Sequence, residues 1–316
     1  MTWNIAKNVT VLTAWMIAAL FTDVASAQKD TDVGRQRTLT TADGWPIHIN
    51  YYESTGGKES PVVILFPGVE GKEESMTRKV WNGAATALHK KGFAVVTADL
   101  RKHGDSLPEM EDSVLARLTK VSGNDYILMA TQDLEAIKTF LLQEHQNEKL
   151  NIRKLGIATA GSGGLVAAKF AEFDWSKKPW PDNAIMSART PKGQDVRALF
   201  FLSPASTVRG INSTSTIRVV ASYPIAAHIW FNPGMKKEKA AAEKLFRYLK
   251  LKDSAAVGDV RKLNEGPDDE SGKYSGEGML QDKAAPIMEK NLTEFFTKNL
   301  KELESPWKSR KSRLFE

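Results

Sequence analysis

The sequence predicts an α/β fold in which one mostly parallel β-sheet carries helices on both faces. Short apolar runs such as Val62–Phe66 suit strands that are buried on both sides. Amphipathic stretches alternate with these runs, and strands that alternate with helices build parallel sheets. The composition agrees with a globular chain, because 41% of the 316 residues are hydrophobic and 26% are charged.

The first 27 residues are typical of a signal peptide. Lys7 supplies a positive charge, Val9–Phe21 is apolar, and Ala25-Ser26-Ala27 places small residues before a cleavage site. We therefore expect cleavage after Ala27, which leaves residues 28–316 as a single domain. An uncleaved membrane anchor is the alternative, although the apolar stretch is short for a bilayer span.

Cysteine is absent from the sequence. This absence excludes disulfides, thiol nucleophiles and thiolate metal sites. An exported protein without disulfides favours a bacterial envelope, so the expected location is periplasmic or secreted.

The predicted elements follow one another in a regular order. Asp43-Gly44 marks a hairpin between the first two strands, and Gly92 ends the first helix. A glycine-rich turn, Gly161–Gly164, joins a strand to a helix. Strands are predicted at Arg37–Thr40, Ile47–Tyr52, Val62–Phe66, Phe93–Ala98, Leu155–Ala158, Val196–Leu202 and Ile225–Phe231. Helices are predicted along Val80–Leu88 and Ile127–Leu141, after Gly164, and at Lys237–Leu249 and Pro286–Leu300, with a surface excursion at Asp174–Asp195.

Four motifs occur in a fixed order along the chain. The loop Phe66–Gly71 follows the third strand, and Asp99–Ser106 follows the fourth. Asp133–Ala136 lies on the next helix, and Leu155–Ala158 leads into the glycine-rich turn. Together these motifs resemble those of the α/β-hydrolase family over nearly the whole mature chain. The resemblance implies an α/β-hydrolase-like fold with an oxyanion loop after the third strand, at Gly68 and Val69.

The turn after the fifth strand allows two alignments with that family. In the family, a G-x-S-x-G turn presents the nucleophilic serine between a strand and a helix. An alignment without gaps places Gly161 at the nucleophile position, and glycine has no side chain to form an acyl-enzyme. A second register, Ala160–Gly164, makes Ser162 the nucleophile but needs a strand one residue longer. We prefer the first register because it keeps the family spacing on both sides, and Ser162 then caps the helix.

The acid and histidine positions implied by the resemblance are also altered. A serine nucleophile needs a base, usually histidine, that a carboxylate orients. Asn232 stands where the family has its acid, and Glu277 within Gly276–Gly278 replaces histidine. No histidine follows His228, which we interpret as a core residue, and His103 is interpreted as a structural hydrogen-bonding residue.

These alterations favour an exported, non-catalytic pseudo-hydrolase that serves as a binding or scaffold protein. The alternative is a serine esterase or acyl hydrolase that uses Ser162, with Glu277 or His103 as the base. The oxyanion donors of that enzyme would be the N–H groups of Val69 and Gly163.

A third hypothesis is a small-molecule binding protein that holds an anion at Gly161–Gly164. No cofactor is expected, and the sequence lacks the H-x-x-x-H and H-E-x-x-H patterns of metal sites. The net charge of +6 is dispersed, and we interpret the basic cluster of Lys308, Arg310, Lys311 and Arg313 as a solvated terminus. The expected partner is a small molecule or a protein rather than a nucleic acid, and no stable transmembrane span is expected after signal cleavage.

Overall fold

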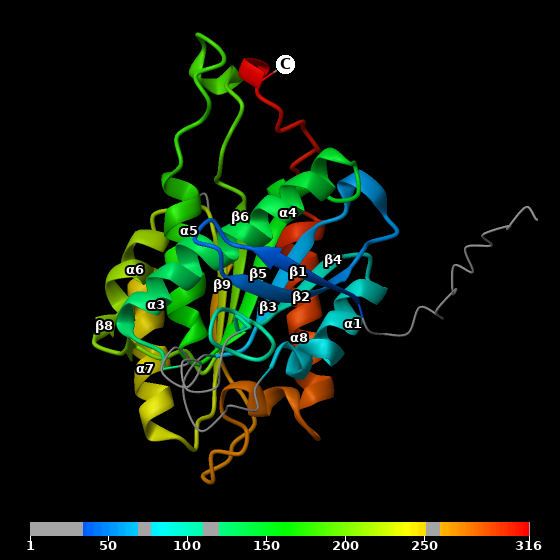
Figure 1. Ribbon diagram of the computed structural model, residues 1–316. Helices are drawn as coiled ribbons and strands as arrows, with labels where there is room; N and C mark the ends of the chain where they lie inside the picture. The colour runs from blue at the N-terminus through cyan, green and yellow to red at the C-terminus, as the bar shows by residue number, and fades with distance from the viewer. Residues whose placement is uncertain (1–33, 69–76, 110–119, 251–259, 316) are drawn as a thin grey trace, which may run out of the picture. The chain divides into compact units, whose positions relative to one another are not determined.

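The computed structural model describes residues 34–68, 77–109, 120–250 and 260–315, and these contain an eight-stranded sheet (Figure 1). Its strands are β1 (Arg35–Thr40), β2 (Pro46–Tyr52), β3 (Val62–Phe66), β4 (Ala94–Ala98), β5 (Leu155–Ala160), β6 (Val196–Leu202), β9 (Ala226–Phe231) and β10 (Arg261–Glu265). They lie in the order β1-β2-β4-β3-β5-β6-β9-β10. The pairs β1–β2 and β2–β4 are antiparallel, and all other neighbours are parallel.

Helices cover both faces of this sheet (Figure 1). One face packs against α1 (Asn82–Lys90) and α8 (Ala285–Phe296). The other face packs against α3 (Gly123–Leu128), α4 (Leu134–Gln146), α5 (Gly163–Ser176), α6 (Ser213–Val220) and α7 (Lys236–Lys250). Short helical turns lie at η1 (Gly57–Glu59), η2 (Arg78–Trp81), η3 (Met129–Asp133), η4 (Ile152–Lys154), η5 (Met186–Ala188), η6 (Gly276–Leu280), η7 (Thr297–Lys301) and η8 (Arg313–Phe315). A small separate ladder joins β7 (Thr207–Val208) to β8 (Ile211–Asn212).

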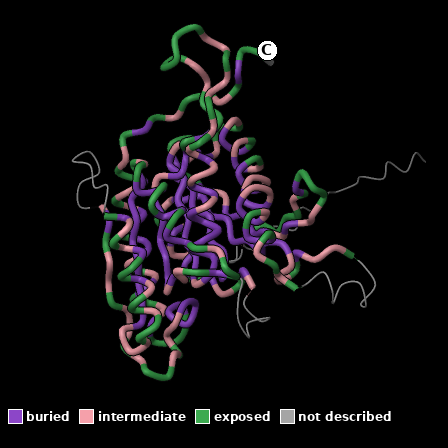
Figure 2. The backbone as a smooth tube through the Cα atoms, turned by 90° about the vertical axis from the view of Figure 1, so that its left-hand side faces the viewer, coloured by how far each residue is buried: buried purple, intermediate pink, exposed green. Residues whose placement is uncertain are grey.

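Strand β3 shows why the apolar runs of the sequence form this sheet. Successive side chains of a strand point to opposite faces. Accordingly, Ile64 belongs to the core beneath α4 and α5, whereas Leu65 belongs to the core beneath α1 and α8. Figure 2 shows the central strands as a continuous buried layer between the two sets of helices. A strand with helices on both sides has to be apolar at every position, which is the pattern of Val62–Phe66.

The predicted fold class, a mostly parallel sheet with helices on both faces, is confirmed. Val62–Phe66 and Val196–Leu202 coincide with observed strands, whereas the strand predicted at Leu155–Ala158 continues to Ala160. The edge strand Arg261–Glu265 was not predicted, because only one of its five residues is apolar. An edge strand has one neighbour and a solvated side, so it needs no continuous apolar run.

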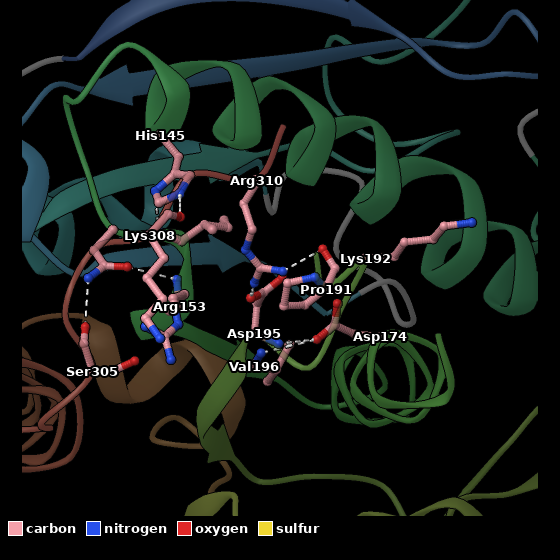
Figure 3. A network of polar contacts seen from close by, with 12 residues as sticks. His145, Arg153, Asp174, Pro191, Lys192, Asp195, Val196, Ser305, Lys308 and Arg310 are labelled. Carbon is pink, nitrogen blue, oxygen red and sulfur yellow. Dashed lines mark hydrogen bonds and ion pairs between the residues drawn. The ribbon is translucent and has the colours of Figure 1, made fainter. Parts of the chain in front are cut away.

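The C-terminal segment, residues 305–313, lies across the amino ends of β5 and β6 (Figure 3). Asn151, just before β5, donates a hydrogen bond of 2.8 Å to the carbonyl oxygen of Ser305. His145 Nε2 lies 2.9 Å from the carbonyl oxygen of Lys308. These backbone carbonyls tie the segment to the core, since both partner side chains are buried.

Arg310 within this segment is not solvated, so the interpretation of the basic cluster as a solvated terminus is wrong for this residue. Its guanidinium is almost fully buried, pairs with Asp195 and donates to the carbonyl oxygen of Pro191 at 2.7 Å (Figure 3). Lys311 and Arg313 are exposed, as expected. The guanidinium is buried because a buried carboxylate compensates its charge, which sequence proximity does not reveal.

Residues 1–33, which include Lys7, Val9–Phe21 and the expected cleavage site after Ala27, lie outside the described residues. The division into a signal peptide and a domain at residues 28–316 therefore stays a prediction. Among the residues that are described, no helix is long and apolar enough to cross a membrane.

Candidate functional site

The turn between β5 and α5 places Gly161 at its apex. Strand β5 ends at Ala160, Gly161 has φ of +50°, and α5 begins at Gly163. The left-handed backbone of Gly161 is a conformation that side chains rarely adopt. Nevertheless, a Cβ atom built on Gly161 meets no atom of the described residues within 4 Å. This geometry is the strained strand-to-helix turn on which α/β-hydrolases place a nucleophile.

Ser162 occupies a different position from the apex. Its backbone is helical, with φ of −68° and ψ of −22°, and the residue is only 4% exposed. It is the N-cap residue of α5 by position, but its side chain makes no capping hydrogen bond, so the prediction that the Ser162 hydroxyl caps this helix is wrong. The apex of the turn is therefore Gly161, and Ser162 lies at the start of the helix.

Gly163 allows α5 to approach the sheet closely. A Cβ atom at this residue would lie 2.0 Å from Thr159 Oγ1 and 3.2 Å from the ring of Phe66. Glycine is required here because any side chain would push the helix away from β5. The N–H groups of Gly164 and Leu165 already donate to the carbonyl oxygens of Gly161 and Ser162, which leaves those two groups unable to hold an anion.

Glu277 lies against the same turn, although more than a hundred residues separate it from Gly161. It belongs to the helical turn η6, is 4% exposed, and its carboxylate accepts a hydrogen bond from the N–H of Gly68. Gly68 lies two residues after the end of β3, and a Cβ atom there would lie 3.0 Å from the carbonyl oxygen of Ala160. The structure thus brings together three predicted site residues, Gly68, Gly161 and Glu277.

Ser203 and Glu238 complete this arrangement, and the sequence analysis did not identify them as site residues. The Ser203 hydroxyl donates to Glu238 Oε2 at 2.7 Å and accepts from the N–H of Gly276 at 3.0 Å. Ser203 follows β6 and has φ of +46°, which is uncommon for a residue with a side chain. This strained serine after a strand holds the turn that carries Glu277. In the sequence, the only sign of this role is that Ser203 directly follows the apolar run Val196–Leu202.

Asn232, at the position of the triad acid, has a structural role. Its Nδ2 donates to the carbonyl oxygen of Asp269 at 2.7 Å, and its Oδ1 accepts from the N–H groups of Asp269 and Gly234 at 3.1 and 3.0 Å. Its backbone N–H donates to Glu238 at 3.3 Å. An aspartate could accept but not donate, so the amide is suited to pinning this loop rather than to orienting a base.

The motif after β4 takes part in a network of ion pairs, in which the arginines are buried and Asp105 is half exposed. Arg78 binds Asp99 and lies 2.8 Å from Asp105, whereas Arg101 lies 2.7 Å from Asp133. The hydrogen bond from Arg78 holds the pKa of the Asp105 carboxyl below its ordinary value. The charges in this motif are therefore compensated internally, as in a structural element.

His103 lies in this motif at 2.8 Å from the carbonyl oxygen of Arg101, through Nδ1. This contact agrees with its interpretation as a structural residue. Val69, one of the expected oxyanion donors, lies outside the described residues. No group of three or more acidic or histidine side chains that could hold a metal ion occurs in the described part of the chain.

Comparisons with known proteins find similar structures but no similar sequence. No family model and no curated protein matches this sequence. An esterase of Pyrococcus furiosus matches with a TM-score of 0.56 at 14% identity, over 84% of this chain and 90% of the esterase. A putative α/β-hydrolase of unknown function from Agrobacterium tumefaciens matches with a TM-score of 0.53 at 10% identity, over 83% of this chain and 95% of that protein.

A third match is the acylaminoacyl peptidase of Pyrococcus horikoshii, with a TM-score of 0.55 at 14% identity. It covers 87% of this chain but only 43% of the peptidase, so the likeness is confined to part of that enzyme. At these identities the matches establish a shared fold and nothing about the reaction.

Proposed function

We propose that this chain, which has the α/β-hydrolase fold, is an exported binding or scaffold protein without serine-hydrolase activity. The hydrogen bond from the Gly68 N–H to the Glu277 carboxylate carries this proposal. In the α/β-hydrolase resemblance, the loop at Gly68 supplies oxyanion donors and histidine stands in the place of Glu277. A carboxylate seated on that loop opposes the negative charge that develops on the oxygen of an acyl substrate.

The nucleophile position supports the same proposal. The apex residue Gly161 has no side chain, and Ser162 is buried in the first turn of a helix. Asn232 pins a loop by donating to a carbonyl oxygen, a contact that the family's acid could not make. Glu277 and Asn232 therefore make structural hydrogen bonds at the positions of the family's histidine and acid, and Gly161 forms a turn at the position of the nucleophile.

Covalent labelling with a fluorophosphonate probe tests the absence of an activated serine. We expect no labelling of the wild-type protein and none of Ser162→Ala, both shown to be folded by circular dichroism. An esterase of the same fold, labelled in parallel, controls for the probe. Labelling of the wild type that disappears in Ser162→Ala contradicts the proposal and makes Ser162 an activated nucleophile.

A double variant, Gly161→Ser with Glu277→His, tests the position of the missing groups. No described residue lies within 4 Å of a Cβ atom built on Gly161, so a hydroxymethyl group meets no described neighbour there, and the histidine would stand on η6, where Glu277 contacts Gly68. We expect this variant to be labelled slowly by the probe, whereas Ser162→Thr with Glu277→His stays unlabelled. Labelling of the second variant alone would assign the apex to residue 162 instead.

Export is part of the proposal and has its own test. The motivation is the signal-like segment that ends at Ala27. We expect N-terminal sequencing of the protein expressed in a bacterial host to begin at Gln28, in the periplasmic or secreted fraction. An intact N-terminus in the cytoplasmic fraction would contradict export.

A further inference from the structure

Residues 177–194, between α5 and β6, form an excursion that carries exposed apolar side chains. Figure 1 shows this excursion, in green, extending away from the sheet and its helices. Its outer turn is η5, where Ile185 and Met186 are 66% and 64% exposed. Large apolar side chains that are scattered singly are ordinary on a protein surface, whereas a group of them indicates a contact site.

The C-terminal segment runs outward beside this excursion. Arg310 Nη1 donates to the carbonyl oxygen of Pro191 at 2.7 Å, and the Ser312 hydroxyl donates to Asp182 Oδ2 at 2.8 Å. The next turn, η8, therefore lies beside the outer part of the excursion, as Figures 1 and 2 both show. Leu314 in η8 is 53% exposed, so a third aliphatic side chain lies at the same end of the domain.

Polar contacts hold the outer turn in place. Asp182 Oδ1 accepts a hydrogen bond of 3.0 Å from the N–H of Thr190. Asn183 Oδ1 accepts one of 2.9 Å from the N–H of Ile185, and the carbonyl oxygen of Asn183 accepts one of 2.7 Å from Arg189 Nε. Because these bonds fix the backbone, the turn does not need to bury its aliphatic side chains, and they are available to a partner.

Basic side chains accompany the aliphatic ones on both segments. Asp182 is the single acidic residue within residues 177–194 and 305–315, and it is already bonded to Thr190 and Ser312. The exposed basic residues of these segments form no ion pair with any described residue, and they are Lys178, Lys192, Lys308, Lys311 and Arg313. Unpaired cations beside exposed aliphatic groups are complementary to anionic lipids, whose phosphates attract the cations while the acyl boundary accepts the aliphatic groups.

The size of the apolar group favours a lipid surface over a protein partner. A stable protein–protein interface takes about 20–30 residues from each side, with an apolar centre that excludes water. Three aliphatic side chains on two adjacent turns are too few for such a centre. A few inserted side chains together with electrostatic attraction are sufficient for reversible binding at the surface of a bilayer.

We propose that the outer end of the excursion and the C-terminal turn η8 bind the surface of a membrane that contains anionic phospholipids. Ile185, Met186 and Leu314 enter the headgroup region, and the exposed lysines and Arg313 face the lipid phosphates. This contact is independent of the proposed function, because it uses no residue of the Gly161 turn and applies on either side of a membrane.

The absence of cysteine from the sequence allows a fluorophore to be placed at one chosen position. Met186→Cys, labelled with the polarity-sensitive dye NBD, is mixed with vesicles of phosphatidylcholine alone or of phosphatidylcholine and phosphatidylglycerol in equal amounts. We expect the emission to rise and shift to the blue with the mixed vesicles only. Ile287→Cys is the matched control, because Ile287 is 57% exposed on α8, and its label should not respond. No change at residue 186, or an equal change at both positions, would overturn the proposal.

Sedimentation with the mixed vesicles separates the apolar and the charged contributions. Ile185→Ser with Met186→Ser should weaken binding about tenfold, whereas Ile287→Ser should bind as the wild type does. Lys311→Gln with Arg313→Gln should also weaken binding about tenfold and reduce its salt dependence. Circular dichroism confirms that each variant is folded. Binding that depends on Lys311 and Arg313 but not on Ile185 and Met186 would refute membrane insertion and indicate an acidic protein as the partner.

Discussion

The two ends of strands β5 and β6 are held in different ways. At the amino ends, charged side chains form a buried network in which Lys138 pairs with Asp174 and Asp195. Arg310 also pairs with Asp195 (Figure 3). At the carboxyl ends, most of the contacts run instead between side chains and backbone N–H groups. There, Glu277 accepts from Gly68, and Ser203 accepts from Gly276.

The amino ends of these two strands thus contribute mainly to stability, whereas the carboxyl ends carry the candidate site. A buried charge that loses its partner is costly, so the amino ends tolerate little change. The carboxyl ends use glycines in left-handed conformations and hydrogen bonds to two carboxylates, Glu277 and Glu238, and no described residue lies within 4 Å of a Cβ atom built on Gly161. Substitutions at the two ends should therefore differ in how much they destabilise the fold, and the predictions below run from the larger effect to the smaller.

Removal of Lys138 is expected to have the largest effect. Its side chain and those of Asp174 and Asp195 are all at most 1% exposed, and its Nζ lies 2.8 Å from Asp195 Oδ2. Lys138→Met leaves two buried carboxylates without this cation. We expect the free energy of unfolding, measured in urea, to fall by about 3–5 kcal/mol.

An exposed ion pair provides the matched control. Lys58 lies 3.5 Å from Glu148, and both side chains are about half exposed. Lys58→Met should change the free energy of unfolding by no more than about 1 kcal/mol. If the two methionine variants were equally stable, the buried network would not be what secures the amino ends.

The sequence predicted the central strands well because their burial on both faces is recorded in each residue, as in Val62–Phe66. It predicted the position of Gly161 through a local turn motif. It could not predict Ser203, the partners of Glu238 or the burial of Arg310, because these depend on which distant segments meet. The edge strand Arg261–Glu265 was missed for a related reason, since its pairing with β9 and not its own pattern makes it a strand.

Removal of Glu277 at the carboxyl ends is expected to have a smaller effect than Lys138→Met. Glu277→Ala leaves the buried N–H of Gly68 without an acceptor, which should cost about 1–2 kcal/mol of unfolding free energy. Glu277→Gln keeps an acceptor oxygen and should restore most of that loss. Hydrogen exchange at the Gly68 N–H, measured by NMR, should be faster in the alanine variant than in the glutamine variant. Equal exchange in both would mean that the charge of Glu277, and not its acceptor, protects this N–H.

The smallest expected effect is a pH dependence that arises at the amino ends. Burial lowers the pKa of His145 below its ordinary value of 6.5, while the carbonyl oxygens of Lys308 and Leu150 partly oppose this shift. Because the unfolded chain takes up this proton first, the free energy of unfolding falls as the pH drops below about 6.5.

Two other buried groups contribute to the pH dependence of the free energy of unfolding in this range. His228, whose pKa is also lowered by burial, destabilises the fold on acidification as His145 does, whereas Asp133 stabilises it. Burial raises the pKa of Asp133 from 3.8 to about 6, so the folded chain takes up this proton first and gains stability on acidification. His145→Gln removes only the contribution of His145 and keeps a donor for the Lys308 carbonyl. We therefore expect the loss of unfolding free energy between about pH 7.5 and pH 5 to be smaller in His145→Gln than in the wild type. Parallel pH profiles would show that the C-terminal segment is held at the amino ends without any contribution from a neutral His145.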